Sequence, residues 1–291
     1  MTTKTTTATT TFTPGRPIFC AGCGHFGVGA ALEGAVDDLG IPRHDLMVIA
    51  GIGCSGTIQN NLVAYGYHAL HGRVLPTATG MALANPSLTV VGAGGDGDGY
   101  AIGAGHLVHA FRRNPSLVYI VMNNGTYGLT KGQDSPTALV DASPAFDAID
   151  LGLSIPGTTF AARGFARRPD QLRQLTRAAI QHAGSGRGFA FLEVLSPCVT
   201  YNDTYTEWDS GVHDVDEDPD YDRTDRIEAL RLSMTLKSEG LQPVGLIYEA
   251  APDSKPLVEP DAPVHGPVDL NLSAENNADA LHRLMETFRI Y

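Results

Sequence analysis

Two short runs of this sequence have the residue types and the spacing of a metal–phosphate site. Residues 95–99 are Gly-Asp-Gly-Asp-Gly, and residues 123–126 are Asn-Asn-Gly-Thr. Magnesium prefers oxygen ligands and usually shares them with phosphates. The side chains of Asp96 and Asn124, with a main-chain carbonyl such as that of Thr126, would leave coordination positions for phosphate oxygens and water. The two runs therefore predict a hard divalent cation held against a diphosphate.

Two other interpretations of the glycine-rich run stay open at this point. Residues 92–97 also fit the G-x-G-x-x-G pattern of a dinucleotide site. That pattern expects an acidic residue at the end of the following strand, where this chain has Asn123 and Asn124. The second alternative is a purely structural turn, because Asp and Asn favour turns for local reasons.

Four cysteines, the number that one tetrathiolate metal site needs, are the second chemical feature: Cys20, Cys23, Cys54 and Cys198. The pair Cys20-x-x-Cys23 by itself fits zinc, a redox pair or an iron–sulfur cluster. Gly24 follows the pair, so the haem-attachment pattern is excluded. A thioredoxin-like pair would not need the other two thiols. Each cysteine taken singly could also be a buried, inert residue.

The elements that must position these residues alternate between strands and helices. The segment 88–94 predicts a buried strand, 101–113 a helix and 116–122 the next strand. The same alternation predicts a helix over 27–39, strands over 46–52, 158–162 and 189–195, and a helix over 169–182. This pattern is typical of an α/β fold with a doubly wound, mainly parallel sheet. Loops that follow parallel strands open on one edge, so the acidic run and the Asn pair should meet there.

Three parts of the chain differ in character. Residues 1–14 are threonine-rich and are expected to form a flexible arm. Residues 15–200 carry the alternating pattern, and 201–291 are expected to be an irregular C-terminal extension packing on the domain or on a partner. Within that extension, 202–224 are rich in acidic residues and 251–271 in proline, while 226–239 and 273–288 predict helices, the second with Ser273 as its N-cap.

Composition excludes several classes of function. The chain has 291 residues, a formal net charge of -12 and only 20 lysines and arginines. This balance argues against binding to nucleic acid or to an anionic membrane. No apolar window is long enough to span a membrane, and the first residues resemble neither a secretory signal nor a transit peptide. We therefore expect a cytoplasmic protein, in which disulfides are rare.

The run from Gly95 to Asn124 resembles the thiamine diphosphate motif, GDG followed by a spacer and NN. Other motifs are similar to those of the β subunit of 2-oxoacid:ferredoxin oxidoreductases: Cys20–His25, Gly51–Ser55, His71–Arg73, Ala78–Gly80 and Tyr127–Gln133. The similarity covers about residues 15–200 and returns weakly at 244–248.

The resemblance implies the thiamine diphosphate-binding fold and a set of site residues. It implies that Asp96, Asn124 and Thr126 bind Mg²⁺ and that all four cysteines hold one [4Fe–4S] cluster, with a structural zinc site as the alternative. The implied thiamine diphosphate contacts are Ile52, Gly53, Cys54, Ser55, His71, Gly95, Gly97, Asp98, Gly128 and Leu129. Thr57 departs from some relatives, in which a basic residue close to the substrate carboxylate is expected.

The implied activity is the CoA-dependent oxidative decarboxylation of a 2-oxoacid to acyl-CoA and CO₂, with reduction of ferredoxin. 2-Oxoglutarate is the favoured substrate, pyruvate or a branched-chain 2-oxoacid is the alternative, and the reverse reaction would fix CO₂. The cofactors carry the chemistry, so no catalytic side chain is expected. A larger α (or fused γα) subunit would supply the pyrimidine-binding domain in an (αβ)₂ assembly. A non-redox thiamine-dependent decarboxylase or synthase subunit and a non-catalytic metal-binding scaffold are the competing hypotheses.

Overall fold

The computed structural model of the chain describes residues 15–138, 145–252 and 274–287. The expected N-terminal arm and most of the proline-rich segment lie outside the described residues. A helix predicted over 273–288 is present as α8 (Ala274–Thr287), although its proposed N-cap, Ser273, lies outside them.

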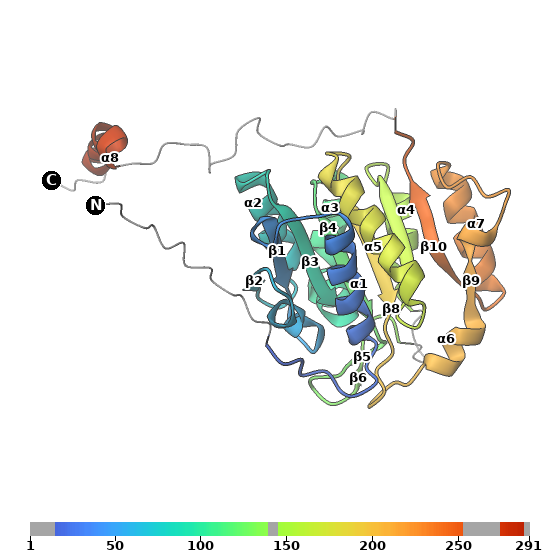
Figure 1. The fold of residues 1–291 in the computed structure, drawn as a ribbon. Coiled ribbons are helices and arrows are strands. Elements are labelled where there is room, and N and C mark those ends of the chain that lie inside the picture. Colours follow the sequence, from blue (N-terminus) through green and yellow to red (C-terminus); the bar gives the residue numbers. More distant parts are fainter. Residues whose placement is uncertain (1–14, 139–144, 253–273, 288–291) are drawn as a thin grey trace, which may run out of the picture.

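An eight-stranded sheet organises the fold (Figure 1). Its strands, in spatial order, are β2 (Tyr65–His68), β1 (Leu46–Ala50), β3 (Thr89–Gly95), β4 (Val118–Asn123), β8 (Ala190–Leu195), β7 (Phe160–Phe165), β10 (Gln242–Glu249) and β9 (Val212–Asp214). Neighbouring strands are parallel, except that β10 runs antiparallel to β7. The predicted doubly wound, mainly parallel α/β sheet is therefore confirmed.

Helices cover both faces of the sheet (Figure 1). The layer on one face consists of α1 (His25–Asp38) and α5 (Pro169–Gly184). The layer on the other consists of α2 (Val74–Ala84), α3 (Ala104–Arg113), α4 (Ala148–Ser154) and α7 (Arg226–Ser238). Side chains of β4 alternate between the two hydrophobic cores, with Ile120 in the first and Tyr119 in the second. A strand buried on both faces explains the continuous apolar run seen in the sequence.

Several elements were not expected from the sequence. β2 is short and exposed, and α2 has no charged residue to mark a polar face, so neither shows a clear period. The segment after Asp96 does not enter a regular α-helix at once, because Gly97–Ile102 forms a π-helical turn before α3 begins. After residue 200, the chain was expected to be irregular, but it forms α6 (Tyr205–Gly211) and adds β9 and β10 to the sheet; α7 is the helix predicted over 226–239. The proposed division into 15–200 and 201–291 stays a prediction.

The carboxyl ends of β1, β3, β4 and β8 lie at the same edge of the sheet, because these strands are parallel. The β1 end leads into a 3₁₀ helix at Ser55–Asn61, and the β4 end leads into a small two-stranded sheet of β5 (Thr126–Tyr127) and β6 (Gln133–Asp134). This edge therefore collects the residues that the motifs single out.

Candidate functional site

Asp96 follows β3 directly and is almost completely buried, at 2% exposure. Its Oδ2 accepts hydrogen bonds from Gly125 N at 2.9 Å, from Ser135 Oγ at 2.5 Å and from Thr137 Oγ1 at 2.7 Å. Burial raises the pKa of this carboxyl group, and the hydrogen bonds work against that shift. These three bonds all go to Oδ2, and the backbone of Gly97 also bonds to the carboxyl group.

The Asn pair lies directly beside Asp96. Asn124 Oδ1 accepts a hydrogen bond from Thr126 N at 3.0 Å, which folds the loop tightly around the side chain. The main-chain carbonyl of Asn124 accepts a bond from Asn202 Nδ2 at 2.9 Å. Asp96, Asn124 and Thr126 are each less than 10% exposed, at 2%, 7% and 6%. The structure thus brings the three predicted magnesium ligands together at one loop, and Asn202 is a support that no sequence motif indicated.

Asp98 bonds to two other segments of the chain, at Ile52 and at His71–Gly72. Its Oδ1 accepts hydrogen bonds from Ile52 N at 3.0 Å, from Gly72 N at 2.8 Å and from His71 Nδ1 at 2.8 Å. Its Oδ2 is buried and has no hydrogen-bond partner among the described residues. Because Asp98 holds His71 by Nδ1, the other imidazole nitrogen, Nε2, can face a ligand. Asp98 is therefore placed to position the contact residues around it.

Close backbone approaches explain several glycines of the motifs. A Cβ added at Gly97 would lie 2.1 Å from Tyr127 Cε1, and one at Gly95 would lie 2.9 Å from Ser55 Oγ. A Cβ at Gly51 would lie 2.2 Å from Asp98 Oδ2. Only glycine lets the loops after β1 and β3 come this near to each other.

Two of the predicted thiamine contacts are apolar and exposed. Ile52 is 38% exposed and Leu129 is 58% exposed, in a protein whose large apolar side chains are mostly buried. Gly53, between Ile52 and Cys54, has a φ of 114°, which favours glycine. Exposed apolar side chains beside a polar metal loop suit a cofactor that has both an aromatic part and a phosphate part.

The four cysteines come from three segments, with Cys20 and Cys23 in the first, and none of them forms a disulfide. Burial raises the pKa of the Cys23 thiol to about 11, a hydrogen bond from the backbone of His25 lowers it, and the other three sulfurs add smaller increases. Burial also raises the pKa of Cys54, with Cys198 and Cys20 contributing. The four thiols are thus near enough to influence one another.

Gly128 connects the thiols with the cofactor loop. A Cβ at this position would lie 3.4 Å from Cys54 Sγ and 3.9 Å from Cys198 Sγ. Gly128 stands only two residues after Thr126, so the sulfurs lie beside the predicted metal loop. No three His, Cys, Asp or Glu side chains within residues 15–138, 145–252 and 274–287 are close enough together to hold a single metal ion as they stand.

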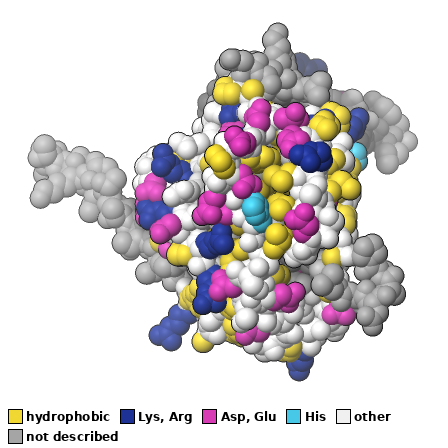
Figure 2. All heavy atoms as spheres, turned by 90° about the vertical axis from the view of Figure 1, so that its right-hand side faces the viewer, with side chains coloured by type: hydrophobic (Ala, Val, Ile, Leu, Met, Phe, Trp, Pro, Cys, Tyr) yellow, Lys and Arg dark blue, Asp and Glu magenta, His cyan; other side chains and the backbone are white. Residues whose placement is uncertain are grey.

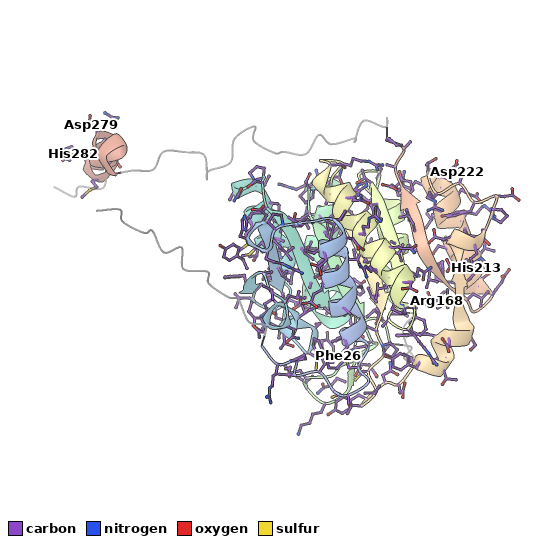
Figure 3. The ribbon with its side chains drawn as sticks, in the orientation of Figure 1. Phe26, Arg168, His213, Asp222, Asp279 and His282 are labelled. Atoms are coloured by element: carbon purple, nitrogen blue, oxygen red, sulfur yellow. The ribbon has the colours of Figure 1, made fainter. Side chains whose placement is uncertain are left out.

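Backbone contacts fix the first cysteine loop against the last. Gly24 N donates to Pro197 O at 3.1 Å, and His25 Nδ1 lies 2.7 Å from Ser196 Oγ in a hydrogen bond. A Cβ at Gly24 would be 2.7 Å from the carbonyl carbon of Ser196, so the loops touch at the main chain. Phe26, labelled in Figure 3, lies in the first turn of α1 beside this contact. These bonds hold the segments of Cys23 and Cys198 side by side.

A buried polar network that the motifs did not predict supports the metal loop from behind. Glu193 Oε1 accepts bonds from Asn123 Nδ2 at 3.2 Å and from Tyr100 Oη at 2.7 Å, and its Oε2 accepts a bond from Arg163 Nε at 2.5 Å. Burial alone would lower the pKa of Arg163, but the Asp147 and Glu193 carboxylates raise it above its ordinary value. The alternation of side chains along the strands could have indicated this network, since Arg163 and Glu193 interrupt otherwise apolar strands.

A cavity of about 740 Å³ opens between the metal loop and this network. Its walls include Asn123, Gly125 and Thr126 on one side, and Arg163 and Lys237 on the other. Both cations are already engaged by carboxylates, Arg163 by Asp147 and Glu193, and Lys237 by Asp147 and Asp150. The cavity therefore offers space beside the predicted metal loop. Neither of these two cations is free to bind an anion there, because each is paired with carboxylates.

Comparison with known families agrees with this geometry. A model described as "Thiamine pyrophosphate enzyme, C-terminal TPP binding domain" matches residues 51–194. A second model, for the C-terminal part of the beta subunit of pyruvate ferredoxin oxidoreductase, matches residues 198–260. The fold and the site thus define a thiamine diphosphate-binding α/β protein.

Individual relatives show to which family of thiamine diphosphate-binding proteins the chain is similar. The chain is 41% identical, over 79% of its length and 81% of the relative's, to "2-oxoacid:ferredoxin oxidoreductase subunit beta" of Saccharolobus solfataricus. It is 38% identical, over 64% of its length and 51% of the relative's, to "2-oxoglutarate oxidoreductase subunit KorB" of Mycobacterium tuberculosis. The chain belongs to the β subunits of the 2-oxoacid:ferredoxin oxidoreductases, which confirms the resemblance seen in the sequence.

A solved structure supports the same assignment. The 2-oxoglutarate:ferredoxin oxidoreductase of Magnetococcus marinus, described with 2-oxoglutarate, coenzyme A and succinyl-CoA bound, matches with a TM-score of 0.77 and 33% identity. The match covers 94% of this chain and 89% of that one. The chain is thus a subunit of an oxidoreductase that works in a heteromeric complex with an α subunit. Among its described helices, none has the length and apolar character needed to cross a membrane.

Proposed function

We propose that this chain binds Mg²⁺–thiamine diphosphate and one [4Fe–4S] cluster, and serves the CoA-dependent oxidative decarboxylation of 2-oxoglutarate with reduction of ferredoxin. The observation that carries the proposal is the contact of buried Asp96, after β3, with the buried Asn124–Thr126 loop, after β4, while Cys54 and Cys198 approach that second loop at Gly128. A metal–diphosphate site and a thiol cluster side by side are the arrangement that electron transfer from a cofactor to a cluster needs.

The side chains of this site bind and orient, and no side chain is assigned a covalent step. Asp96 lies at the proposed metal site, where Ser135, Thr137 and Gly125 hold its Oδ2. Asp98 holds His71 so that its outer nitrogen can meet the diphosphate or the thiamine rings. Thiamine diphosphate, when bound, supplies the electron sink that decarboxylation of a 2-oxoacid requires.

We favour a cluster over zinc because relatives are named ferredoxin oxidoreductases, and electron transfer to ferredoxin needs a redox-active centre, which zinc is not. One zinc ion would hold four sulfurs at about 2.3 Å from a single point. Ligands of a four-iron cluster each bind a different iron, so their sulfurs stand farther apart while still influencing one another. The mutual effects on the thiol pKa values fit the wider arrangement.

The substrate proposal rests on relatives. The KorB relative and the Magnetococcus marinus enzyme are both named for 2-oxoglutarate, while the Saccharolobus solfataricus relative is named only for 2-oxoacids. We further propose that the pyrimidine-binding domain of an α or fused γα subunit completes the cofactor site in an (αβ)₂ assembly. The reaction is reversible, so a strongly reduced ferredoxin would drive CO₂ fixation.

Binding of the cofactor is tested by calorimetric titration of thiamine diphosphate into the αβ complex, with and without Mg²⁺. Asp96→Ala should abolish the magnesium-dependent binding, while Asp222→Ala, at an exposed turn, should leave it unchanged. Equal affinity of wild type and Asp96→Ala for the cofactor would overturn the proposed metal site.

The cluster is tested on anaerobically purified complex by iron, sulfide and zinc analysis and by visible absorption. We expect a brown protein whose absorption bleaches on reduction and whose iron content falls in Cys198→Ser beyond what clusters on partner subunits account for. A colourless β subunit that contains zinc would refute the redox proposal and leave the non-redox thiamine enzyme as the better hypothesis.

Substrate identity is tested by assaying the complex against 2-oxoglutarate, pyruvate and branched-chain 2-oxoacids, with coenzyme A and oxidised ferredoxin. The expected result is the highest kcat/KM with 2-oxoglutarate and no turnover when coenzyme A is omitted. A higher kcat/KM for pyruvate or a branched-chain 2-oxoacid would show that the substrate proposal is wrong while the cofactor proposal stands.

A further inference from the structure

We infer that the α subunit docks on the end of the sheet formed by β2 together with the adjoining outer faces of α2 and α3, and we call this surface the β2 face. It comprises Tyr67, Leu70, Pro76, Gly80, Ile102, Gly105 and Val108. The inference rests on the proposed function, because it takes the partner to be the subunit that completes the cofactor site.

The segment that builds most of the β2 face is almost free of charge. Between Leu46 and Gly95, the only Asp, Glu, Lys or Arg is Arg73. The whole chain is 18% charged, so fifty average residues would carry about nine charges. Buried strands explain part of this depletion, but β2 and the outer face of α2 are at the surface. Surfaces in contact with water usually carry charged residues, so the lack of charge in this surface segment needs another explanation.

The residues of β2 are all exposed, although two of the four are tyrosines and none is Asp, Glu, Lys or Arg. Tyr67 is 48% exposed, and Leu70, just after the strand, is 78% exposed. β2 is the terminal strand of the sheet and pairs only with β1 within the described residues. Edge strands that face water usually carry charges, particularly lysine, to prevent pairing with other chains. β2 has none, so it lacks the usual protection of a free edge.

The next helix along the chain, α2, shows the same property. α2 contains no charged residue in its 11 positions, and Pro76 and Gly80 are exposed on it. A helix on the surface of a protein normally has a polar outer face. Ile102, at the end of the π-helical turn before α3, is 53% exposed, and Gly105 and Val108 on α3 follow at three-residue spacing, Gly105 exposed and Val108 at 36%. Residues three or four apart lie on the same side of a helix, so the first part of α3 extends the uncharged surface, which ends at Arg112 in the last turn.

The opposite end of the sheet has the composition expected of a surface in water. Figure 2 shows acidic and basic side chains spread over the end formed by β9 and α7. Arg168 pairs there with Asp214, and His213 with Asp218 (Figure 3 labels Arg168 and His213). Charged side chains are therefore common at the β9 end of the sheet and rare at the β2 end. This contrast is what an interface at the β2 end requires.

The β2 face is continuous with the proposed cofactor site, and this favours the α subunit, rather than a second copy of this chain, as its partner. Leu70 and Gly72 flank His71, which Asp98 holds at the site edge. A Cβ at Gly72 would lie 2.4 Å from Ile102 Cγ2, so the site loop and the start of the β2 face are in contact. A partner seated on this face therefore reaches the open side of the cofactor site. The α subunit is proposed to complete that site, so it is the partner that we expect on the β2 face.

The test uses the co-expressed αβ complex and four single variants. Tyr67→Glu and Leu70→Glu place a charge in the β2 face. Ile227→Glu and Met234→Glu are matched controls, since these apolar residues are 64% and 59% exposed on α7 at the charged end. We expect the β2-face variants to weaken the affinity for the α subunit by at least about 30-fold, as loss of an interface hot spot does, and the controls to change it less than about threefold.

The outcome of the affinity measurement shows which molecule binds the β2 face. If Leu70→Glu and Tyr67→Glu bind the α subunit as tightly as wild type, the inference is wrong while the proposed function stands. If they instead convert a dimer of this chain into a monomer and leave the α affinity unchanged, the face binds a second copy and the inference is also wrong. If wild type itself fails to bind the α subunit, the proposed function fails first. Should either variant lose its folded circular dichroism spectrum, Gly80→Glu and Val108→Glu, on the helices, decide the question by the same affinity measurement.

Discussion

Asp98 Oδ1 lies 2.8 Å from His71 Nδ1, and this single oxygen also accepts two main-chain N–H groups. Two segments from different parts of the chain, at Ile52 and at His71–Gly72, thus converge on one carboxylate oxygen. The pattern assigns Asp98 a different task from Asp96, although both belong to the same five-residue run. Asp96 lies at the proposed metal site, whereas Asp98 bonds to the loops around the proposed cofactor site.

Asp98→Asn should destabilise the folded chain by about 2–3 kcal/mol, since bonds to a charged acceptor in a buried site are lost or weakened. It should also raise the KM for thiamine diphosphate more than it lowers kcat, because His71 loses its orientation. Urea unfolding and cofactor titration measure the two effects. Asp222→Asn, at an exposed turn, is the control and should change neither. An unchanged KM for the cofactor in Asp98→Asn would contradict the positioning role.

Gly24→Ala should lower the iron content of the complex and destabilise the chain by about 1–3 kcal/mol, as overpacking does. The added methyl group would meet the main chain of Ser196 at 2.7 Å and force the Cys23 loop away from Cys198. Gly29→Ala, within α1 and with nothing within 4 Å of its Cβ position, is the control. It should keep full iron content and be neutral or stabilising by about 0.5–1 kcal/mol. Equal iron content in the two variants would refute the explanation.

Arg163→Met should cost about 3–5 kcal/mol, because it leaves the buried Glu193 carboxylate without its cation. In the double variant Arg163→Met with Glu193→Gln the charge is removed with its partner, so the cost should be at least about 1 kcal/mol below the sum of the single costs. Urea unfolding of the four proteins gives the coupling energy. Arg231→Met, which breaks the exposed pair with Glu228, should have no measurable effect. Additive costs within error would show that the two buried residues do not act together.

Folding stability should fall as the pH drops below about 6.5, the ordinary value for histidine. Burial lowers the pKa of His182 below that value in the folded state. The unfolded chain then binds the proton more readily, so stability is lost toward acid, with a slope of up to about 1.4 kcal/mol per pH unit for this one group. His182→Gln should reduce the slope measured between pH 5 and 6.5, whereas His44→Gln, at an exposed residue, should not. An identical slope in wild type and His182→Gln would contradict the assignment.

Much of the fold followed from local pattern. The apolar runs at 46–52, 88–94, 116–122 and 189–195 became β1, β3, β4 and β8 with small shifts at their ends. Strands buried on both faces appear as unbroken apolar runs, and their alternation with helices restricts the topology to few arrangements. By contrast, β2 and α2 escaped prediction because neither alternates polar with apolar residues. A surface covered by a partner does not need polar residues, so the inferred interface explains why the alternating polar pattern is missing from β2 and α2.

The sequence predicted that Asp96 and Asn124 have the spacing for magnesium and that four cysteines have the count for one cluster, and both ligand sets stay predictions. These predictions depend on residue types and on separations along the chain. The groups that support the site became known only from the folded chain. Ser135 and Thr137 bond to Asp96, Asn202 bonds to the Asn124 carbonyl, and Glu193 reaches Asn123 from β8. Contacts of this kind form when distant segments pack, so no local pattern encodes them, and the different tasks of Asp96 and Asp98 became visible only there.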